Sequence, residues 1–272
     1  MSTQKKDGGV EPYGFDQAGS DERRRLALIE QLQDQPTTRR LTELGVRDGW
    51  RCLDVGVGGG SITRWLRVRV GPEGAVVALD LDTRFVDGEA GIEARTGDIL
   101  TVDLEPGAYD LVHCRALLHH LAGHQQTALE RMRKALRPGG ILIATEPYTG
   151  PMLDSRTPAW VASARALHAA MPGADYAWAA TLPATMHAAG LSHVAACADS
   201  DVVHGATPLA ELIGMTFQAV RSRVTDTAAI DAALALLQDP TTFEPGVVWY
   251  SAWGVNLGRT CTDHWEVMAD VA

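Results

Sequence analysis

The first half of the chain alternates between short, uniformly apolar runs and stretches in which apolar residues recur every three or four positions. Uniform apolar runs predict buried strands, and the second spacing predicts amphipathic helices. We expect strands at 51–55, 75–80, 92–96, 109–114 and 141–145. We expect helices at 20–35, 37–44, 61–70 and 123–136. Apolar strands separated by helices predict a parallel sheet that is covered on both faces.

The second half is less regular, and its start is rich in proline. Residues 147–180 are therefore expected to form an insertion over the sheet rather than another strand–helix unit. The further helices are expected at 157–171, 181–190, 207–223 and 227–238, and the further strands at 193–200 and 247–255. Ligands of parallel sheets bind beyond the carboxyl ends of the strands, so polar residues at those ends become site candidates.

A glycine-rich turn follows the first strand in Leu53-Asp54-Val55-Gly56-Val57-Gly58-Gly59-Gly60-Ser61, and Asp80 ends the second strand. This pairing predicts a nucleotide-like cofactor whose ribose is held by the second acid. A phosphate-binding loop would need a lysine followed by Ser or Thr after the last glycine, and Ser61-Ile62 stands there instead. A dinucleotide fingerprint matches poorly, because its third glycine would fall at position 61.

A third interpretation of the cofactor site rests on several motifs that follow one another along the chain. The chain resembles the class I S-adenosylmethionine (SAM)-dependent methyltransferases over roughly residues 41–146. The residues that carry the resemblance are Asp54 with the glycine loop, Asp80, Gly97-Asp98-Ile99, Tyr109-Asp110-Leu111-Val112, Leu118-His119-His120-Leu121 and Leu136-Arg137-Pro138-Gly139-Gly140. Glycines would let the backbone pass close to the amino-acid part of SAM. Asp80 would accept hydrogen bonds from both ribose hydroxyls.

The resemblance implies an α/β fold: a Rossmann-like, doubly wound, mostly parallel seven-stranded sheet with helices on both faces and a helical substrate cap. It also implies SAM as cofactor and S-adenosylhomocysteine as product. The expected cofactor-binding residues are Tyr13, Asp54, Gly56, Gly58, Gly60, Asp80, Leu81, Asp98, Ile99, Cys114 and Arg115. One domain is expected, divided into an N-terminal helical lid (1–45), a SAM-binding core (46–146), cap insertions (147–180 and 205–245) and a last strand (246–257).

Methyl transfer needs an aligned acceptor and a dry site, and a base only where the acceptor loses a proton. The candidate catalytic residues are His119, His120 and Glu146, because they follow the fourth and fifth strands at the cofactor end of the sheet. The alternative is that one histidine packs against the following helix while the other stays at the surface, and that Glu146 has a capping role. His113, His119, His120 and His124 also suggest a metal site, but Gly123 interrupts the helical spacing and no metal is expected.

The acceptor is expected under an apolar roof. Candidates for this roof are Tyr148, Met152, Trp160, Met171, Trp178, Met215 and Phe217, and Trp249 shares a strand face with Trp253. The substrate-pocket residues expected from this pattern are Tyr148, Trp160, Trp178, His204, Met215 and Trp249. Such a lining suits a hydrophobic small molecule, and the resemblance implies a natural product. Plain core packing is the alternative for each tryptophan. Tyr13 and Phe15 are expected to belong to a lid over the cofactor, or else to be a docking anchor.

Composition and charge limit the kinds of partner that are expected for this protein. The chain has 272 residues and a net charge of −10, without a clustered basic face, so nucleic acid is not an expected partner. No apolar run approaches the roughly 20 residues that cross a bilayer, and residues 1–10 lack the apolar core of a secretory signal. Four cysteines without a CxxC pair indicate reduced thiols in a cytoplasmic protein. The protein is expected to be a monomer or a homodimer, and the sequence does not distinguish the two. The remaining alternatives are a SAM-binding protein with a non-methylating reaction such as cyclisation, an NAD-dependent oxidoreductase, and an inactive scaffold.

Overall fold

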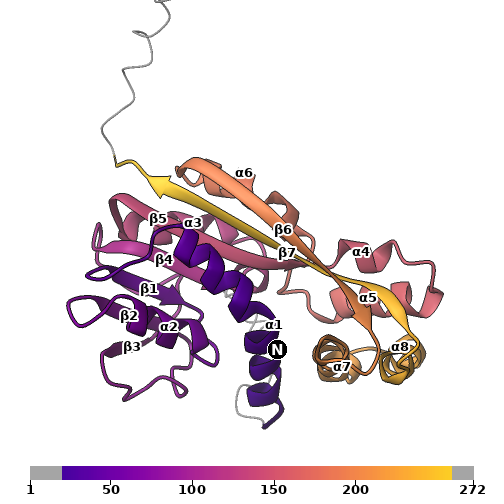
Figure 1. Ribbon diagram of the computed structural model, residues 1–272. Coiled ribbons are helices and arrows are strands. Elements are labelled where there is room, and N and C mark those ends of the chain that lie inside the picture. The colour runs from indigo at the N-terminus through magenta and orange to yellow at the C-terminus, as the bar shows by residue number, and fades with distance from the viewer. Residues whose placement is uncertain (1–19, 259–272) are drawn as a thin grey trace, which may run out of the picture.

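The computed structural model describes residues 20–258 and contains a seven-stranded sheet in the order β3-β2-β1-β4-β5-β7-β6 (Figure 1). Its strands are β1 (Arg51–Val55), β2 (Ala75–Asp80), β3 (Ile92–Thr96), β4 (Tyr109–Arg115), β5 (Leu136–Tyr148), β6 (Ser192–His204) and β7 (Phe243–Asn256). Strands β1 to β5 run parallel to one another, and β7 runs antiparallel between β5 and β6. The predicted α/β fold with a mostly parallel seven-stranded sheet is confirmed.

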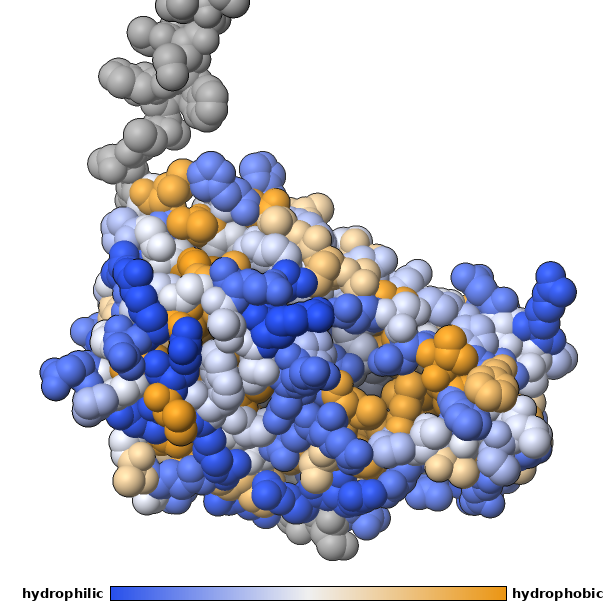
Figure 2. Space-filling view, in the orientation of Figure 1, coloured by the Kyte–Doolittle hydropathy of each residue, from blue (hydrophilic) through white to orange (hydrophobic). Residues whose placement is uncertain are grey.

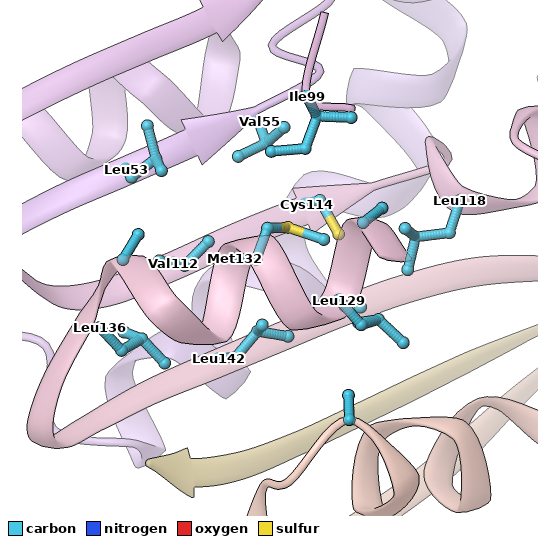
Figure 3. Close-up of a cluster of buried hydrophobic side chains, with 14 of the residues drawn as sticks. Leu53, Val55, Ile99, Val112, Cys114, Leu118, Leu129, Met132, Leu136 and Leu142 are labelled. Atoms are coloured by element: carbon cyan, nitrogen blue, oxygen red, sulfur yellow. The ribbon is translucent and has the colours of Figure 1, made fainter. Parts of the chain in front are cut away.

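Helices cover both faces of the sheet. On one face, α3 (Gln125–Ala135) and α6 (Leu182–Ala188) pack against side chains of β1, β4 and β5 (Figure 3). On the other face, α1 (Ser20–Glu43) and α2 (Ser61–Arg69) enclose a second cluster with alternate residues of the same strands. Because side chains of a strand alternate between faces, uniformly apolar strands serve both clusters at once.

The N-terminal helix is longer than its sequence pattern predicts. We expect two helices separated at Pro36, but α1 is continuous through that proline. Proline removes one backbone donor, whereas burial of Leu28 and Leu41 on either side of it holds both halves against the protein. Tertiary packing therefore overrides the local signal, and the two-helix prediction is wrong.

Four helices lie beyond the carboxyl ends of the parallel strands, and we call them the helical extension (Figure 1). They are α4 (Gly150–Leu153), α5 (Pro158–Ala170), α7 (Pro208–Arg221) and α8 (Ala228–Gln238). They share a hydrophobic cluster of their own, separate from the two clusters of the sheet. The segments that form them follow β5 and β6, as the sequence pattern predicts. Two short 3-10 helices, η1 (Leu118–His120) and η2 (Trp178–Thr181), complete the described elements.

The last two strands exceed their predicted lengths. β6 and β7 pair along most of their lengths, with register shifts near Ser192 and Ser200, and β7 also pairs with β5 from Gly140 to Tyr148. Cross-strand pairing extends strands into segments whose own sequences lack an apolar pattern. Within residues 20–258, the structure has no helix with the length and apolarity that a bilayer crossing requires.

Candidate functional site

A cavity of about 350 Å³ opens at the carboxyl ends of β1, β2, β4 and β5. Its walls come from the glycine loop after β1, from the N-terminal half of α1 and from the helical extension. On the side of the molecule where α7 lies, hydrophobic side chains gather around a hollow in the surface (Figure 2). The site thus lies where open parallel sheets bind their ligands.

The glycine loop needs its glycines for two reasons. Gly58 and Gly60 have φ angles of +53° and +86°, a region that favours glycine. A Cβ at Gly60 would come within 2.3 Å of Val86, and one at Gly58 would come within 3.1 Å of Leu26 on α1. The loop therefore runs in close contact with its neighbours and begins α2 directly after Gly60.

Asp80, at the end of β2, faces the cavity and also holds the glycine loop in place. Its carboxylate accepts hydrogen bonds from the backbone N–H of Gly58 at 3.1 Å and of Asp82 at 3.0 Å. Burial raises the pKa of Asp80, and these donors partly oppose the shift. A carboxylate has about four lone-pair positions, so Asp80 can still accept from a ligand hydroxyl. Asp98 lines the same wall and accepts from the backbone N–H of Leu100 at 2.8 Å.

Asp54 forms a buried network beneath the loop. It accepts a hydrogen bond from Thr63 Oγ1 at 2.6 Å and meets His113 Nδ1 at 2.7 Å. A carboxylate only accepts, so Nδ1 of this imidazole carries a proton. Nε2 is buried and has no hydrogen-bond partner in the described part of the chain, although His113 lines the cavity.

Arg115, at the end of β4, fixes α1 over the site. Its guanidinium donates to Asp34 at 3.0 Å and to Thr37 at 3.1 Å, and Asp34 also accepts from Ser61 at 2.9 Å. The next residue, Ala116, has a φ of +52°, which is uncommon for a residue with a Cβ. Backbone strain of this kind occurs often at functional sites.

Glu146, at the end of β5, is fully buried and fixes the segment after β4. It accepts hydrogen bonds from the backbone N–H groups of Leu117, Leu118 and His119, at 2.8 to 3.1 Å. Its carboxylate also meets His119 Nδ1 at 2.7 Å. Because Nδ1 faces an acceptor, His119 keeps the Nε2 lone pair for another partner.

Burial shifts the acidities of this pair in opposite directions. It raises the pKa of Glu146 to about 7, against the three backbone donors. It lowers the pKa of His119 to about 3, with Arg25 adding to the effect. Burial likewise lowers the pKa of His120, whose ring centroid lies 3.8 Å from that of His119. Neutral imidazoles next to a carboxyl group titrating near neutrality are a pattern found at proton-transfer sites.

The opposite end of the cavity is apolar. Its lining there comprises Leu121, Pro147, Met152, Leu167, Tyr176, Leu209, Leu212, Ile213, Phe217, Val247 and Trp249. Polar atoms are few: Thr149 contacts His168 Nε2 at 2.7 Å, and the Tyr176 hydroxyl donates to Met171 Sδ at 3.3 Å. The His168 and Tyr176 rings stack with centroids 5.6 Å apart, so His168 supports Tyr176 from behind the wall.

Several residues expected at the site do not line the cavity. They are Gly60, Cys114, Glu146, Tyr148, Trp160, Trp178, His204 and Met215. Glu146 lies behind the wall, where it contacts His119. Cys114 lies in the core against Met132 of α3 (Figure 3), and Trp160 packs edge-on against Phe217 inside the helical extension. Tyr148 packs on Tyr250, Trp178 lies against the core of the sheet, and His204 stacks on Phe243. Large aromatic side chains complete the separate core of the helical extension, and the apolar pattern alone does not distinguish such a core from a pocket wall. Tyr13 and Phe15 lie outside the described residues.

The sequence predicts an N-terminal helical lid, but its pattern singles out none of the α1 residues that line the cavity. Glu22, Arg25, Leu26, Ile29 and Glu30 all line the cavity. The helical spacing of Leu26 and Ile29 signals an inward face, but nothing in the pattern says that this face covers a site rather than a core. Other lining residues that the pattern did not single out as pocket residues are His113, Thr149, Leu167, Tyr176 and the α7 residues Leu209, Leu212, Ile213 and Thr216.

The lining is strongly acidic. It contains six carboxylates and two guanidinium groups: Glu22, Glu30, Asp54, Asp80, Asp82 and Asp98, with Arg25 and Arg115. Arg25 pairs with Glu22 at 2.7 Å, and Arg115 pairs with Asp34 of α1. This excess of negative charge favours a ligand with cationic groups and disfavours a pyrophosphate.

Comparison with known proteins relates the central part of the chain to a family of domains. The model of the "Methyltransferase domain" family matches residues 53–144. An uncharacterized 37.1 kDa protein from a Streptomyces fradiae transposon is 32% identical over 145 residues, which are 49% of this chain and 41% of that protein. The demethylmenaquinone methyltransferase of Staphylococcus aureus is 28% identical over 115 residues, which are 40% of this chain and 47% of that enzyme. The chain thus spans less than half the length of these curated relatives.

Solved structures agree on the fold. The YcgJ protein of Bacillus subtilis superposes with a TM-score of 0.57 and 12% identity, covering 82% of this chain and 98% of that one. A Haemonchus contortus phosphoethanolamine N-methyltransferase, solved in complex with SAM, superposes with a TM-score of 0.55 and 16% identity, covering 86% of this chain and 57% of that one. Residues 53–144 are therefore a methyltransferase domain, and the sheet that contains them has the fold of the class I SAM-dependent methyltransferases.

Proposed function

We propose that the protein transfers the methyl group of SAM to a hydrophobic small molecule. The observation that carries this proposal is the division of one cavity into two ends. One end has the glycine loop with Asp80 and Asp98, and the other is apolar with His119 and His120 at the boundary. A cofactor and an acceptor bound at these ends would meet inside the one cavity.

The residues present fit SAM. SAM has a sulfonium and an ammonium group and carries no phosphate, and the excess of carboxylates in the lining suits such a cation. Asp80 would hold the ribose hydroxyls with its free lone pairs while its other contacts fix the glycine loop. Asp98 would accept from the adenine amine, and Ile99 would pack against the ring. When bound, SAM supplies a methyl group on a sulfonium centre, which is a good leaving group.

Glu146 and His119 would remove a proton from an acceptor that must lose one. Nε2 of His119 would take the proton from the acceptor, while the Nδ1 proton moves to Glu146. The proton ends on Glu146, because its pKa of about 7 lies above that of His119, about 3. His120 would shape the wall next to this pair.

The acceptor class follows from the apolar end. Leucine, isoleucine, methionine and aromatic side chains of four elements line it, and the Tyr176 hydroxyl is already engaged by Met171. An apolar acceptor with a single acidic hydroxyl, nitrogen or carbon centre fits this lining. One relative is named for demethylmenaquinone, which is itself an apolar acceptor. The sequence makes this proposal more specific. The acceptor would be a natural product that is methylated in the cytoplasm, and the helical extension would act as the substrate cap.

The test is equilibrium binding followed by isotope transfer. Calorimetry should show heat on titration with SAM and S-adenosylhomocysteine and none with NAD. Incubation with SAM labelled in its methyl group and a panel of apolar phenols and quinols should then yield labelled product. Saturation by NAD without any response to SAM would refute the proposal. Binding of SAM with an acceptor consumed but no label transferred would favour a non-methylating reaction.

A further inference from the structure

We propose that Glu30 of α1 is the receptor for the α-ammonium group of the cofactor's amino-acid part. This inference rests on the proposed binding of SAM and adds a residue that none of the sequence motifs contains. Glu30 lies in the N-terminal half of α1, outside the matched residues 53–144, and lines the cavity next to the glycine loop.

Glu30 is held against the backbone of the loop. An added Cβ at Gly59 would lie 2.2 Å from Glu30 Oε1, so this oxygen occupies the space that a side chain at position 59 would take. The Glu30 carboxylate therefore packs directly against the backbone of Gly59. The carboxylate reaches the loop between the contacts of Leu26 with Gly58 and of Asp34 with Ser61.

The same oxygen lacks a donor. Glu30 Oε1 is buried and has no hydrogen-bond partner among residues 20–258. The guanidinium nearest to the added Cβ position belongs to Arg23, 3.4 Å away, and this group lies over the Phe85 ring at 4.8 Å. A buried carboxylate oxygen without a donor costs free energy, which a ligand N–H donor would recover.

The position of Glu30 indicates which part of the ligand its carboxylate would contact. Asp80 and Asp98, which suit ribose and adenine, lie at the ends of β2 and β3. Glu30 comes instead from α1 and meets the centre of the glycine loop, where the backbone allows close approach of the amino-acid part. An ammonium group offers three N–H donors and a full positive charge, which matches one orphaned carboxylate oxygen.

The test compares three ligands on the full chain. S-adenosylmethionine has the ammonium and the sulfonium groups, S-adenosylhomocysteine has the ammonium group alone, and 5′-methylthioadenosine has neither. Glu30→Gln should weaken the first two by the same factor, about tenfold to a hundredfold, as for a lost hydrogen bond to a charged group. It should leave the affinity for methylthioadenosine unchanged. Calorimetry or fluorescence titration gives the dissociation constants without any need for turnover.

The matched control is Glu43→Gln, the same change near the other end of α1, at a half-exposed residue that pairs with Arg40. It should alter none of the three affinities. Gly59→Ala is a second variant for the same contact, because its methyl group would displace the Glu30 carboxylate. It should reproduce the pattern of Glu30→Gln, and it serves as the test if that variant does not fold.

The other outcomes refute the inference in different ways. Equal loss for all three ligands would give Glu30 a structural role, and loss for S-adenosylmethionine alone would assign the carboxylate to the sulfonium. Unchanged affinities in both variants would remove Glu30 from the site while leaving the proposed function intact. If the wild-type protein binds none of the three ligands, the proposed function itself fails.

Discussion

At the scale of single residues, the site is built from carboxylates that each do two things. Asp80 holds the glycine loop and faces the cavity, Asp54 orients His113, and Glu146 holds the segment after β4 and orients His119. A carboxylate has four lone-pair positions, so it can fix the backbone and still accept from a ligand or an imidazole. Burial raises the pKa of Asp80 and of Glu146.

Asp80→Asn tests the ribose assignment. The amide keeps one acceptor oxygen and the size of the side chain, but it loses the charge and one acceptor. We expect the affinity for S-adenosylmethionine to fall by about 2 kcal/mol, as for a hydrogen bond to a charged group. Calorimetric titration measures the affinity, and an unchanged dissociation constant would remove Asp80 from ribose binding.

The pKa of Glu146 predicts the pH dependence of methyl transfer to an acceptor that loses a proton. Burial raises this pKa to about 7, and only the ionised form can receive the proton relayed by His119. The rate should therefore be low below pH 7, rise through about pH 7 and level off above it. A pH profile of single-turnover rates at saturating substrates measures this. Glu146→Gln should abolish the rising limb, whereas a wild-type profile that is flat from pH 6 to 8 would exclude the relay.

At the scale of elements, α1 links the two halves of the cavity. It contacts the glycine loop and the end of β4 on one side, and it packs against α7 on the other. Two ion pairs make these links and differ in burial. Arg115–Asp34 is largely enclosed, with 9% of the Arg115 side chain exposed, whereas Arg24–Glu211 is exposed on both sides. Removing one partner of a buried ion pair lowers the free energy of unfolding more than removing one partner of an exposed pair.

Removing one partner from each pair tests that difference. Asp34→Ala leaves the enclosed Arg115 guanidinium without its carboxylate and removes the acceptor of Ser61. We expect a loss of about 1–3 kcal/mol in the free energy of unfolding, because Asp34 is itself partly exposed. Arg24→Ala should cause no measurable change. Urea denaturation gives both values, and equal effects of the two variants would contradict this account.

At the scale of the whole molecule, the sheet and the helical extension form separate cores that meet at one cavity. The sheet supplies the glycine loop and the acids at the strand ends, and α7 supplies much of the apolar wall. Changes in the helical extension should therefore affect the acceptor without affecting the cofactor.

Thr216→Trp tests this separation, because Thr216 lies on α7 at the cavity wall and is partly exposed. The larger side chain should fill part of the acceptor end and raise KM for bulky apolar acceptors about tenfold or more, by excluding them from the space they need. The dissociation constant of S-adenosylhomocysteine should stay within error of the wild-type value. Parallel loss of both affinities would mean that the two ends are not independent.

The sequence alone determined the sheet, the order of its elements and the acids beyond the strands, because each of these depends on local periodicity and on glycines that permit unusual φ angles. Leu53–Val55, Gly58 and Asp80 are examples. Only the tertiary structure decided which side chains line the cavity. The side chains of Trp160 and Cys114 lie in hydrophobic cores. Glu30, His113 and Tyr176 line the cavity, although the local sequence pattern around them does not indicate a binding site. The physical reason is that an apolar or charged side chain has the same helical spacing whether it packs against a core or against a ligand, and only the packing of distant elements distinguishes the two.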